Sequence, residues 1–277
     1  MSFITEVIPG AENQPIKLDV HWPVDGTPKH LVVFCHGYKG FKDWGAWHAL
    51  GEYFAVQGMA FIKFNFSHNG LGESSDGDFD RLDLFAENNY SKELYDTEQV
   101  LRYISEQNHF RELKIHLLGH SRGGGIVLIK AFQNKSVTSV ITLASVCDYG
   151  VRFPFGKALQ QWKEEGVFHV MNGRTGQKMP HHIQFLHDYY NNLEALDIRS
   201  KLKRYDKPLL VIHASDDLAV HISEAMKIKK WNPTADLVVL PEGGHTFGAK
   251  HPWEENDLPK PLLNAMEHAV EFINSQA

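Results

Sequence analysis

The chain has 277 residues, 43% of them hydrophobic and 22% charged, proportions that exclude a disordered or fibrous protein. Its formal charge is −6 and no cluster of Lys and Arg is present, so nucleic acid is not an expected partner. No stretch approaches the roughly 20 apolar residues of a membrane span, and the first residues lack the pattern of a secretory signal. We therefore expect a cytoplasmic protein with no membrane partner.

Apolar runs of strand length alternate with amphipathic segments of helix length, a pattern typical of β-α units around a mostly parallel sheet. Residues 9–13 form a short, turn-prone connection, which predicts an antiparallel hairpin at the sheet edge. The eight predicted strands are 3–8, 16–22, 31–35, 60–65, 114–118, 140–144, 209–213 and 236–240. The predicted helices are 44–56, 91–106, 122–133, 222–231 and 261–274.

Residues 148–206 interrupt this alternation, because the segment is too long for one crossover helix and is rich in aromatic residues. We interpret it as a cap inserted into a single domain of residues 1–277. Within it, 167–171 and 177–185 flank a turn that contains Gly173 and Gly176, two residues that readily adopt positive φ angles. A small β-hairpin is therefore predicted in the cap.

The strand at 114–118 leads into Gly119-His120-Ser121-Arg122-Gly123 and then into an apolar helix. A strand, a sharp turn and a helix are the context of a nucleophile elbow, in which small residues must lie two positions before and after the serine. Such a pentapeptide arises by chance in roughly one chain in ten, so the flanking elements carry the interpretation. The alternative is a glycine-rich turn without chemistry.

A serine hydroxyl needs an imidazole to take its proton, and the imidazole needs a carboxylate to orient it. In this context the chain order is serine, acid, histidine. His245 lies on a glycine-rich loop after the last predicted strand, which makes it the candidate base. We assign packing and hydrogen-bonding roles to His36 and His120, and no metal site to His181 and His182, which point to opposite faces of a strand.

Three carboxylates follow predicted strands and compete for the role of the acid. Asp216 and Asp217 both follow 209–213, and Asp148 follows 140–144. Asp216 could instead cap the turn.

The negative charge that develops on a substrate carbonyl oxygen requires two backbone N–H groups that already point at it. We predict that Arg122 supplies one of them and Tyr38, which lies between Gly37 and Gly40, the other. For the side chains of Arg122 and Tyr38 we expect packing or ion pairing.

Taken together, these motifs resemble the α/β-hydrolase superfamily across almost the whole chain. Residues 65–74, Asn-Phe-Ser-His-Asn-Gly-Leu-Gly-Glu-Ser, look like the segment after the fourth strand in cinnamoyl (feruloyl) esterases and in the related serine-aminopeptidase-like and dienelactone-hydrolase-like groups. Their acid motif, Gly-x-x-Asp-x-x-Val, matches residues 214–220 with Ala in place of Gly, and this resemblance selects Asp217 as the acid.

The resemblance also implies a small insertion, partly a hairpin, that forms a wall of an aromatic-acid pocket. The aromatic residues of the cap are candidates for that wall or, alternatively, for a small core of the cap itself: Phe153, Phe155, Trp162, Phe168, Phe185, Tyr189 and Tyr190.

The predicted activity is hydrolysis of a carboxylic ester through an acyl-enzyme, of feruloyl type or as a general carboxylesterase, with a small-molecule ester as the partner. The same three residues also support hydrolysis of an amide, a thioester or a carbon-carbon bond, and a non-catalytic binding module is a further alternative. We expect no metal or organic cofactor, buried thiols at Cys35 and Cys147, and a monomer or small homo-oligomer.

Overall fold

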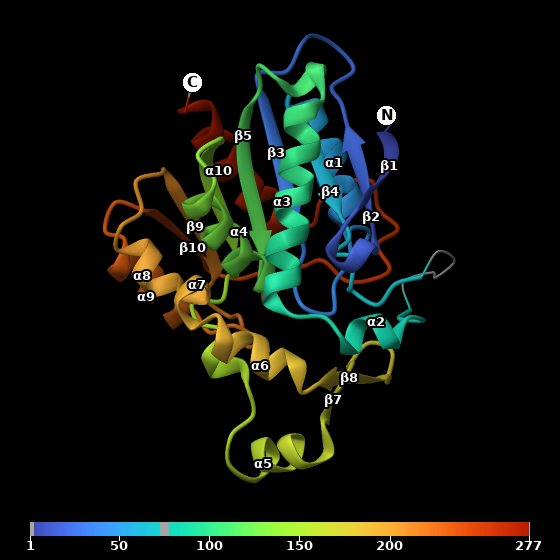
Figure 1. Cartoon of the computed structure of the whole chain (residues 1–277). Helices are drawn as coiled ribbons and strands as arrows, with labels where there is room; N and C mark the ends of the chain where they lie inside the picture. The colour runs from blue at the N-terminus through green and yellow to red at the C-terminus, as the bar shows by residue number, and fades with distance from the viewer. Residues whose placement is uncertain (1–2, 73–77, 277) are drawn as a thin grey trace.

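A central sheet of eight strands dominates the computed structural model, which describes residues 3–72 and 78–276 (Figure 1). The strand order is β1-β2-β4-β3-β5-β6-β9-β10. Antiparallel pairing is confined to β1 with β2 and β2 with β4, and the other neighbours are parallel. The strands are β1 (Phe3–Pro9), β2 (Pro15–His21), β3 (His30–Cys35), β4 (Ala60–Phe64), β5 (Lys114–His120), β6 (Val137–Leu143), β9 (Leu209–Ala214) and β10 (Asp236–Leu240). The mostly parallel sheet and its edge hairpin are confirmed.

Two hydrophobic cores lie on opposite faces of the sheet, because successive side chains of a strand point to opposite sides. On β3, Val32 and Phe34 contribute to one core, while Leu31, Val33 and Cys35 contribute to the other. The first core is covered by α1 (Trp47–Val56) and α10 (Lys260–Asn274). The second is covered by α3 (Tyr90–Glu106), α4 (Arg122–Gln133) and α9 (Ser223–Trp231). Burial on both faces explains why β3 is apolar throughout.

The first predicted helix is shorter than expected, since α1 begins at Trp47 and not at residue 44. Gly45 has a φ of +57°, a left-handed conformation that no right-handed helix contains, and its N–H donates to the Nδ1 atom of His251. The glycine therefore ends the preceding turn and separates Trp44 from the helix.

A buried carboxylate on α3 connects the edge hairpin to the helices that cover the second core. Asp96 on α3 accepts hydrogen bonds from the backbone N–H groups of Ala11 and Ser67, at 2.8 and 2.7 Å. Burial raises the pKa of Asp96 to about 6, although both hydrogen bonds favour its charged form. Short helical segments complete this part of the chain: η1 (Ala11–Asn13), α2 (Leu82–Ala86) and η2 (Asn108–Phe110).

The part of segment 148–206 from α5 to α6 lies below the sheet in the view of Figure 1 and contains the predicted hairpin, β7 (Val167–Met171) paired with β8 (Lys178–His182). In the turn, Gly176 has a φ of +70°, whereas Gly173 does not need a positive φ. The predicted strand 177–185 is too long, because α6 (Gln184–Asn191) begins where the side chain of Gln184 bonds to the carbonyl of Asn88. The remaining helices are η3 (Gly150–Arg152), α5 (Gly156–Glu165), α7 (Leu193–Leu196) and α8 (Ile198–Leu202).

The two cysteines, Cys35 and Cys147, are free and buried, as predicted. Glu73 and Ser74, the last residues of the segment 65–74, lie outside the described residues. Among the described residues, none of the helices combines the length and the hydrophobicity needed to cross a membrane.

Candidate active site

Ser121 lies on a sharp turn between β5 and α4, with φ 56° and ψ −116°. This left-handed conformation is strained for a residue with a side chain. A Cβ atom at Gly123 would lie 2.3 Å from the backbone oxygen of Cys35, and one at Gly119 would lie 2.4 Å from the backbone oxygen of Gly123. Only glycine allows the strand and the helix to approach this closely, which explains the residues on both sides of the serine.

The next two glycines of the helix face side chains that follow β6. A Cβ atom at Gly124 would lie 2.3 Å from the Oγ atom of Ser145, and one at Gly125 would lie 2.5 Å from the hydroxyl of Tyr149. Each glycine costs about 1 kcal/mol of helix propensity relative to alanine. Close packing around the start of α4 accounts for this cost.

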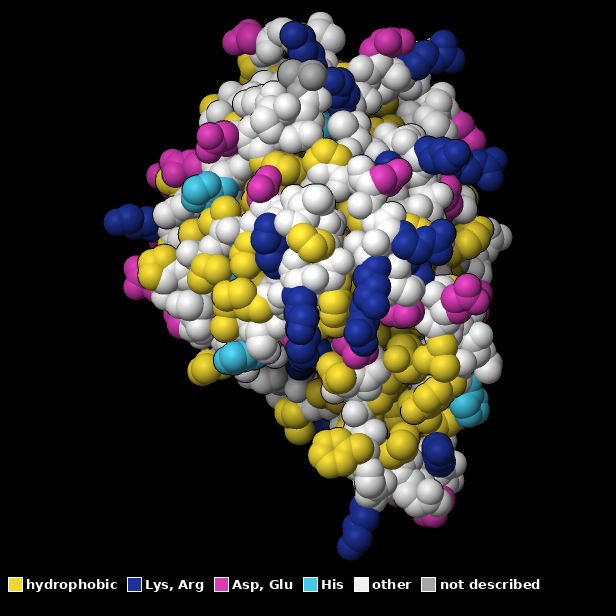
Figure 2. Space-filling view, turned by 90° about the vertical axis from the view of Figure 1, so that its left-hand side faces the viewer, with side chains coloured by type: hydrophobic (Ala, Val, Ile, Leu, Met, Phe, Trp, Pro, Cys, Tyr) yellow, Lys and Arg dark blue, Asp and Glu magenta, His cyan; other side chains and the backbone are white. Residues whose placement is uncertain are grey.

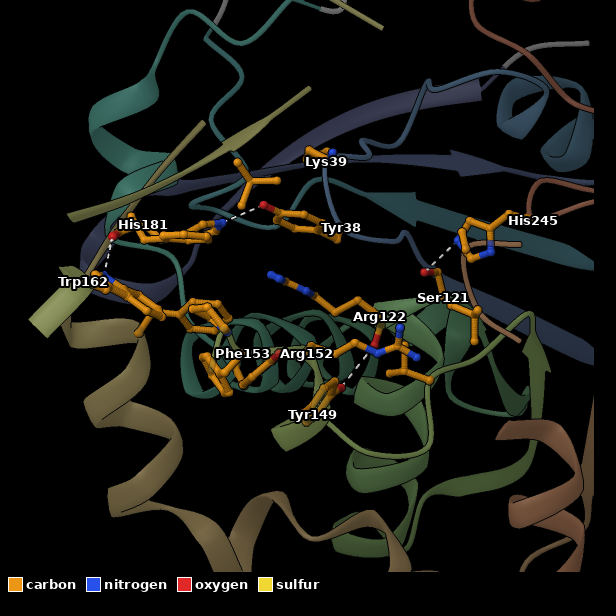
Figure 3. A pocket seen from close by; sticks show the side chains of 18 residues that line it. Tyr38, Lys39, Ser121, Arg122, Tyr149, Arg152, Phe153, Trp162, His181 and His245 are labelled. Carbon is orange, nitrogen blue, oxygen red and sulfur yellow. Dashed lines mark hydrogen bonds between the residues drawn. The ribbon is translucent and has the colours of Figure 1, made fainter. Parts of the chain in front are cut away.

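The structure brings Ser121, His245 and Asp217 into one hydrogen-bonded chain. The Nε2 atom of His245 lies 3.0 Å from Oγ of Ser121, and its Nδ1 atom lies 2.8 Å from Oδ2 of Asp217 (Figure 3). Because the carboxylate accepts from Nδ1–H, Nε2 is free to accept the serine proton.

Asp217 is held on both of its oxygens. Its Oδ1 atom accepts from the N–H groups of Ala219 and Val220 at 2.8 and 2.9 Å, while Oδ2 faces His245 and lies 3.4 Å from Nε2 of His213. Burial on its own would raise the pKa of Asp217, but hydrogen bonds from His213, His245 and the Val220 amide hold the pKa well below its usual range. The carboxylate is therefore charged at any pH near neutrality.

The two other candidate acids have different positions. Asp216 accepts hydrogen bonds from the N–H groups of Gly243 and Gly244, at 3.3 and 2.8 Å, so it braces the loop that carries His245. Asp148 is exposed and accepts from the N–H group of Gly150. Neither carboxylate is hydrogen-bonded to His245.

His120 and His36 hold the surroundings of the serine in place, as expected. The Nε2 atom of His120 lies 2.9 Å from the carbonyl oxygen of His245, and burial lowers the pKa of His120 to about 3. His36 is also buried, which lowers its pKa to about 4, and its Nδ1 atom lies 2.9 Å from the carbonyl oxygen of Gly37. Both rings are therefore neutral and act as hydrogen-bond braces.

The backbone N–H groups of Tyr38 and Arg122 lie on the loop after β3 and at the first position of α4. Within the part of the chain that the structure describes, neither N–H group has a hydrogen-bond acceptor from the protein. The first N–H groups of a helix lack intrahelical partners and carry the positive end of its dipole. These two groups are thus available to an oxygen bound beside Ser121.

A cavity of about 450 Å³ opens next to Ser121 and His245 (Figure 3). Segment 148–206 supplies much of its wall. Of the seven aromatic residues named from the sequence, Phe153, Trp162, Phe168 and Phe185 line it. Phe155 and Tyr190 are instead 88% and 55% exposed. The lining rings also pack on one another, with Phe153 and Phe185 at 5.1 Å between centroids, so they form both a wall and a small core.

The side chain of Arg122 extends into this cavity and makes the packing and ion-pair contacts expected for it from the sequence (Figure 3). Its guanidinium carbon lies 4.2 Å from the ring centroid of Tyr38 and 5.2 Å from that of Tyr90. Behind it, Glu93 accepts a hydrogen bond from Arg122 at 3.2 Å. Burial raises the pKa of Glu93, and the opposing charge of Arg122 offsets this effect in part.

His181 and His182 point to opposite sides of β8, as expected for neighbours on a strand. His181 is buried and its Nε2 atom lies 2.6 Å from the hydroxyl of Tyr38, whereas His182 is exposed and contacts Glu87. Burial lowers the pKa of His181 to about 3. In the described part of the chain, no three His, Cys, Asp or Glu residues are grouped so that they could hold a metal ion.

Sequence reasoning missed two buried partners of the site. His213 lies near the end of an otherwise apolar strand, four residues before Asp217, and this unusual placement was the available signal. Glu93 lies on the buried face of α3 together with Thr97 and Val100, a helical spacing that predicts a buried acid and hence a cationic partner.

The sheet order, the strained turn at Ser121 and the contacts among three polar side chains define an α/β-hydrolase. The sequence model of the family described as serine aminopeptidase, S33, matches residues 26–195, and the chain belongs to this family of hydrolases. An uncharacterized 31.7 kDa protein of Escherichia coli, from the traX-finO intergenic region, is 29% identical over 125 residues. That match spans 45% of this chain and 40% of the E. coli protein.

Solved structures of similar fold include esterases. Est1E from Butyrivibrio proteoclasticus with ferulic acid bound has a TM-score of 0.70 at 18% identity, covering 100% of this chain and 99% of that one. Dienelactone hydrolase from Anabaena variabilis has a TM-score of 0.64 at 16% identity, covering 99% and 97%. Alpha/beta hydrolase domain-containing protein 10 from mouse has a TM-score of 0.69 at 18% identity, covering 99% and 100%. At these identities the likeness establishes the fold.

Proposed function

We propose that this hydrolase cleaves a carboxylic ester through an acyl-enzyme, with Ser121 as nucleophile, His245 as base and Asp217 as the acid that orients the base. The observation that carries the proposal is the chain of contacts at 3.0 and 2.8 Å beside a cavity large enough for a small acyl group.

In the first half of the reaction, Oγ of Ser121 bonds to the ester carbonyl carbon as its proton passes to Nε2 of His245. The carbonyl oxygen becomes an anion and accepts hydrogen bonds from the N–H groups of Tyr38 and Arg122. The carbon-oxygen bond to the alcohol then breaks, and His245 returns its proton to the departing alcohol oxygen.

In the second half, a water molecule gives a proton to His245 and its oxygen bonds to the acyl carbon. The bond to Oγ breaks, Ser121 regains a proton from His245 and the free acid leaves. The charged Asp217 stabilises the imidazolium that forms twice in this cycle.

Two hollows meet at Ser121, and they differ in size and lining. The cavity of about 450 Å³ reaches under segment 148–206, whereas a second hollow of about 190 Å³ is lined by His120, Thr246, Trp44 and Trp47. His245, which must protonate the departing alcohol, lines both hollows, and we place the alcohol in the smaller one, which Thr246 of the same loop also lines. The larger cavity then receives the acyl group.

The aromatic lining of the larger cavity supports an acyl group that is itself aromatic or apolar. Est1E, which has the same fold and was solved with ferulic acid bound, agrees with a feruloyl-type substrate. A general carboxylesterase is the broader form of the proposal.

The family description favours a second candidate, hydrolysis of an amide at the amino terminus of a peptide. An aminopeptidase must hold the ammonium group of its substrate, a task suited to a carboxylate. Among the described residues, no Asp or Glu lines the cavity, whereas Lys39, Arg122 and Arg152 all do. This charge disfavours a cationic substrate and supports the ester.

The test is a panel of p-nitrophenyl acyl esters and methyl hydroxycinnamates, assayed beside the matching amides and beside Ser121→Ala. We expect ester turnover that Ser121→Ala abolishes while its thermal unfolding stays close to that of the wild type. Turnover that survives in a clean preparation of Ser121→Ala would refute the assignment. Faster turnover of the amide that shares an acyl group with an ester would transfer the proposal to the second candidate.

A further inference from the structure

The charges that face the acyl cavity are all of one sign. Three of its 18 lining residues are cations, Lys39, Arg122 and Arg152, and none of the lining residues in the described chain is an acid. The whole chain has 34 acidic and 28 basic residues, so this excess of cations is opposite to its overall composition.

Arg122 is held in place, yet most of its donors are not used by the protein. The guanidinium lies against the rings of Tyr38, Tyr90 and Phe185, at 4.2, 5.2 and 5.3 Å from their centroids. Among the described residues, the hydrogen-bond acceptor of the guanidinium is Glu93, which accepts from the NH1 nitrogen of Arg122. Arginine carries five N–H donors in a rigid fork, so the others remain available to a ligand in the cavity.

The other two cations approach the same space from different elements. Arg152, in η3, pairs with Glu224, which does not line the cavity. Lys39, on the loop after β3, donates to the carbonyl oxygen of Met171 at 3.2 Å and has no carboxylate partner among the described residues. Burial and then the charge of Arg122 lower the pKa of Lys39. Lys39 and Arg122 thus repel each other, and no acidic residue of the described chain lines the cavity between them.

An anion bound between these side chains would relieve that repulsion and use the free donors. A carboxylate matches the fork of an arginine with two parallel hydrogen bonds, and such charge-assisted bonds are strongest away from water. The aromatic rings around the cavity leave room for an apolar or aromatic link between the two ends of the acyl group.

We propose that the acyl group of the substrate carries a second, free carboxylate, so that the substrate is a monoester of a dicarboxylic acid. The ester carbonyl lies at Ser121 and the carboxylate lies against the guanidinium of Arg122, with Lys39 and Arg152 adding to the positive potential. This inference rests on the proposed ester hydrolysis and on the placement of the acyl group in the larger cavity.

The test compares matched pairs of p-nitrophenyl esters, each pair having one acyl chain that ends in a carboxylate or in the primary amide. We expect kcat/KM to favour the carboxylate by about tenfold or more at one chain length, the size expected for one charge-assisted contact. The preference should shrink as salt concentration rises. A wild-type protein that prefers the neutral ester, or does not discriminate, overturns the proposal.

Variants locate the source of the preference. Arg122→Met keeps the backbone N–H and much of the side-chain length but leaves Glu93 buried without its partner, so the double variant with Glu93→Gln is made beside it. Lys39→Met and Arg152→Met remove the other two charges. Each should lower the ratio of kcat/KM for carboxylate over amide, Arg122→Met with Glu93→Gln most of all. A ratio that none of them changes overturns the proposal.

The matched control removes a cation from open surface. Lys203→Met removes the charge of an exposed lysine that directly follows α8. Figure 2 looks onto the side of the molecule where α8 lies in Figure 1, and on that side Lys and Arg side chains lie among hydrophobic and acidic ones in contact with solvent. Lys203→Met should leave the ratio at its wild-type value. An equal drop in this variant would mean that net charge, and not the cavity, sets the preference, and would overturn the proposal.

Two further outcomes separate this inference from the proposed function. If a carboxylate raises kcat/KM only when the alcohol group of the ester carries it, the proposed placement of the carboxylate is wrong while ester hydrolysis stands. If no ester is hydrolysed, calorimetry with Ser121→Ala decides the inference alone. Tighter binding of a dicarboxylate than of its monoamide supports the anion site, and equal binding contradicts it.

Discussion

Asp217→Asn probes the orientation of His245 without changing the shape of the site. The Oδ1 atom of Asp217 accepts two backbone N–H groups, at 2.8 and 2.9 Å. The amide oxygen of asparagine must take that position, because the opposite orientation would lose two hydrogen bonds worth about 1 kcal/mol each. The NH2 group of the variant therefore faces Nδ1 of His245.

Nδ1 of His245 must then accept a hydrogen bond, so the ring proton moves to Nε2 and points at Ser121. A protonated Nε2 cannot take the serine proton. We expect kcat for an ester that the wild type hydrolyses to fall by about 10⁴-fold, or about 5 kcal/mol in activation free energy. Thermal unfolding should show that the variant is still folded.

The control for this variant is its neighbour. Asp216→Asn removes the same charge one residue earlier, at a carboxylate that braces Gly243 and Gly244 and does not contact His245. It should reduce kcat by less than about tenfold, since one of its two backbone contacts is kept. Equal losses in the two variants, or a loss of less than tenfold in Asp217→Asn, would refute the reasoning.

Three further predictions concern stability. Gly123→Ala places a Cβ atom 2.3 Å from a backbone oxygen of β3 and should cost about 3 kcal/mol in urea unfolding, while Gly173→Ala, with open space around it, should change stability by less than about 0.5 kcal/mol. Burial raises the pKa of Asp96 to about 6 in the folded state, so its protonated form adds stability below about pH 4, and this stability is lost as pH rises through 6. The difference in Tm between the wild type and Asp96→Asn should therefore change between these pH values. A difference that stays constant would contradict the assignment. Tyr38→Phe removes a part-buried contact of 2.6 Å to His181 and should cost about 1–3 kcal/mol in urea unfolding, an unchanged midpoint being the contrary result.

Local sequence was sufficient where one short segment builds one feature. The glycines around Ser121 predicted the turn, and the structure shows that backbone atoms of β3 and α4 occupy the space a side chain would need. The buried strands were recognisable because β3, covered on both faces, is apolar throughout. The edge hairpin followed from a short connection with turn-forming residues.

Sequence reasoning was weaker where distant segments meet. The contact between Arg122 and Glu93, and that between Tyr38 and His181, join residues whose spacing along the chain gives no sign of proximity. Within 148–206, α5 and α6 were missed, and the second strand of the hairpin was predicted too long because residues 184 and 185 belong to α6. The choice between Asp216 and Asp217 came from resemblance, since both follow the same strand.

The most direct test of the account is covalent labelling of the purified protein with a fluorophosphonate, followed by intact-mass and peptide mass spectrometry. We predict one adduct per chain, located on Ser121, formed by the wild type, strongly slowed in Asp217→Asn and absent in Ser121→Ala. A folded wild-type protein that gains no adduct, or gains one on another residue, would contradict the proposal that Ser121 is an activated nucleophile.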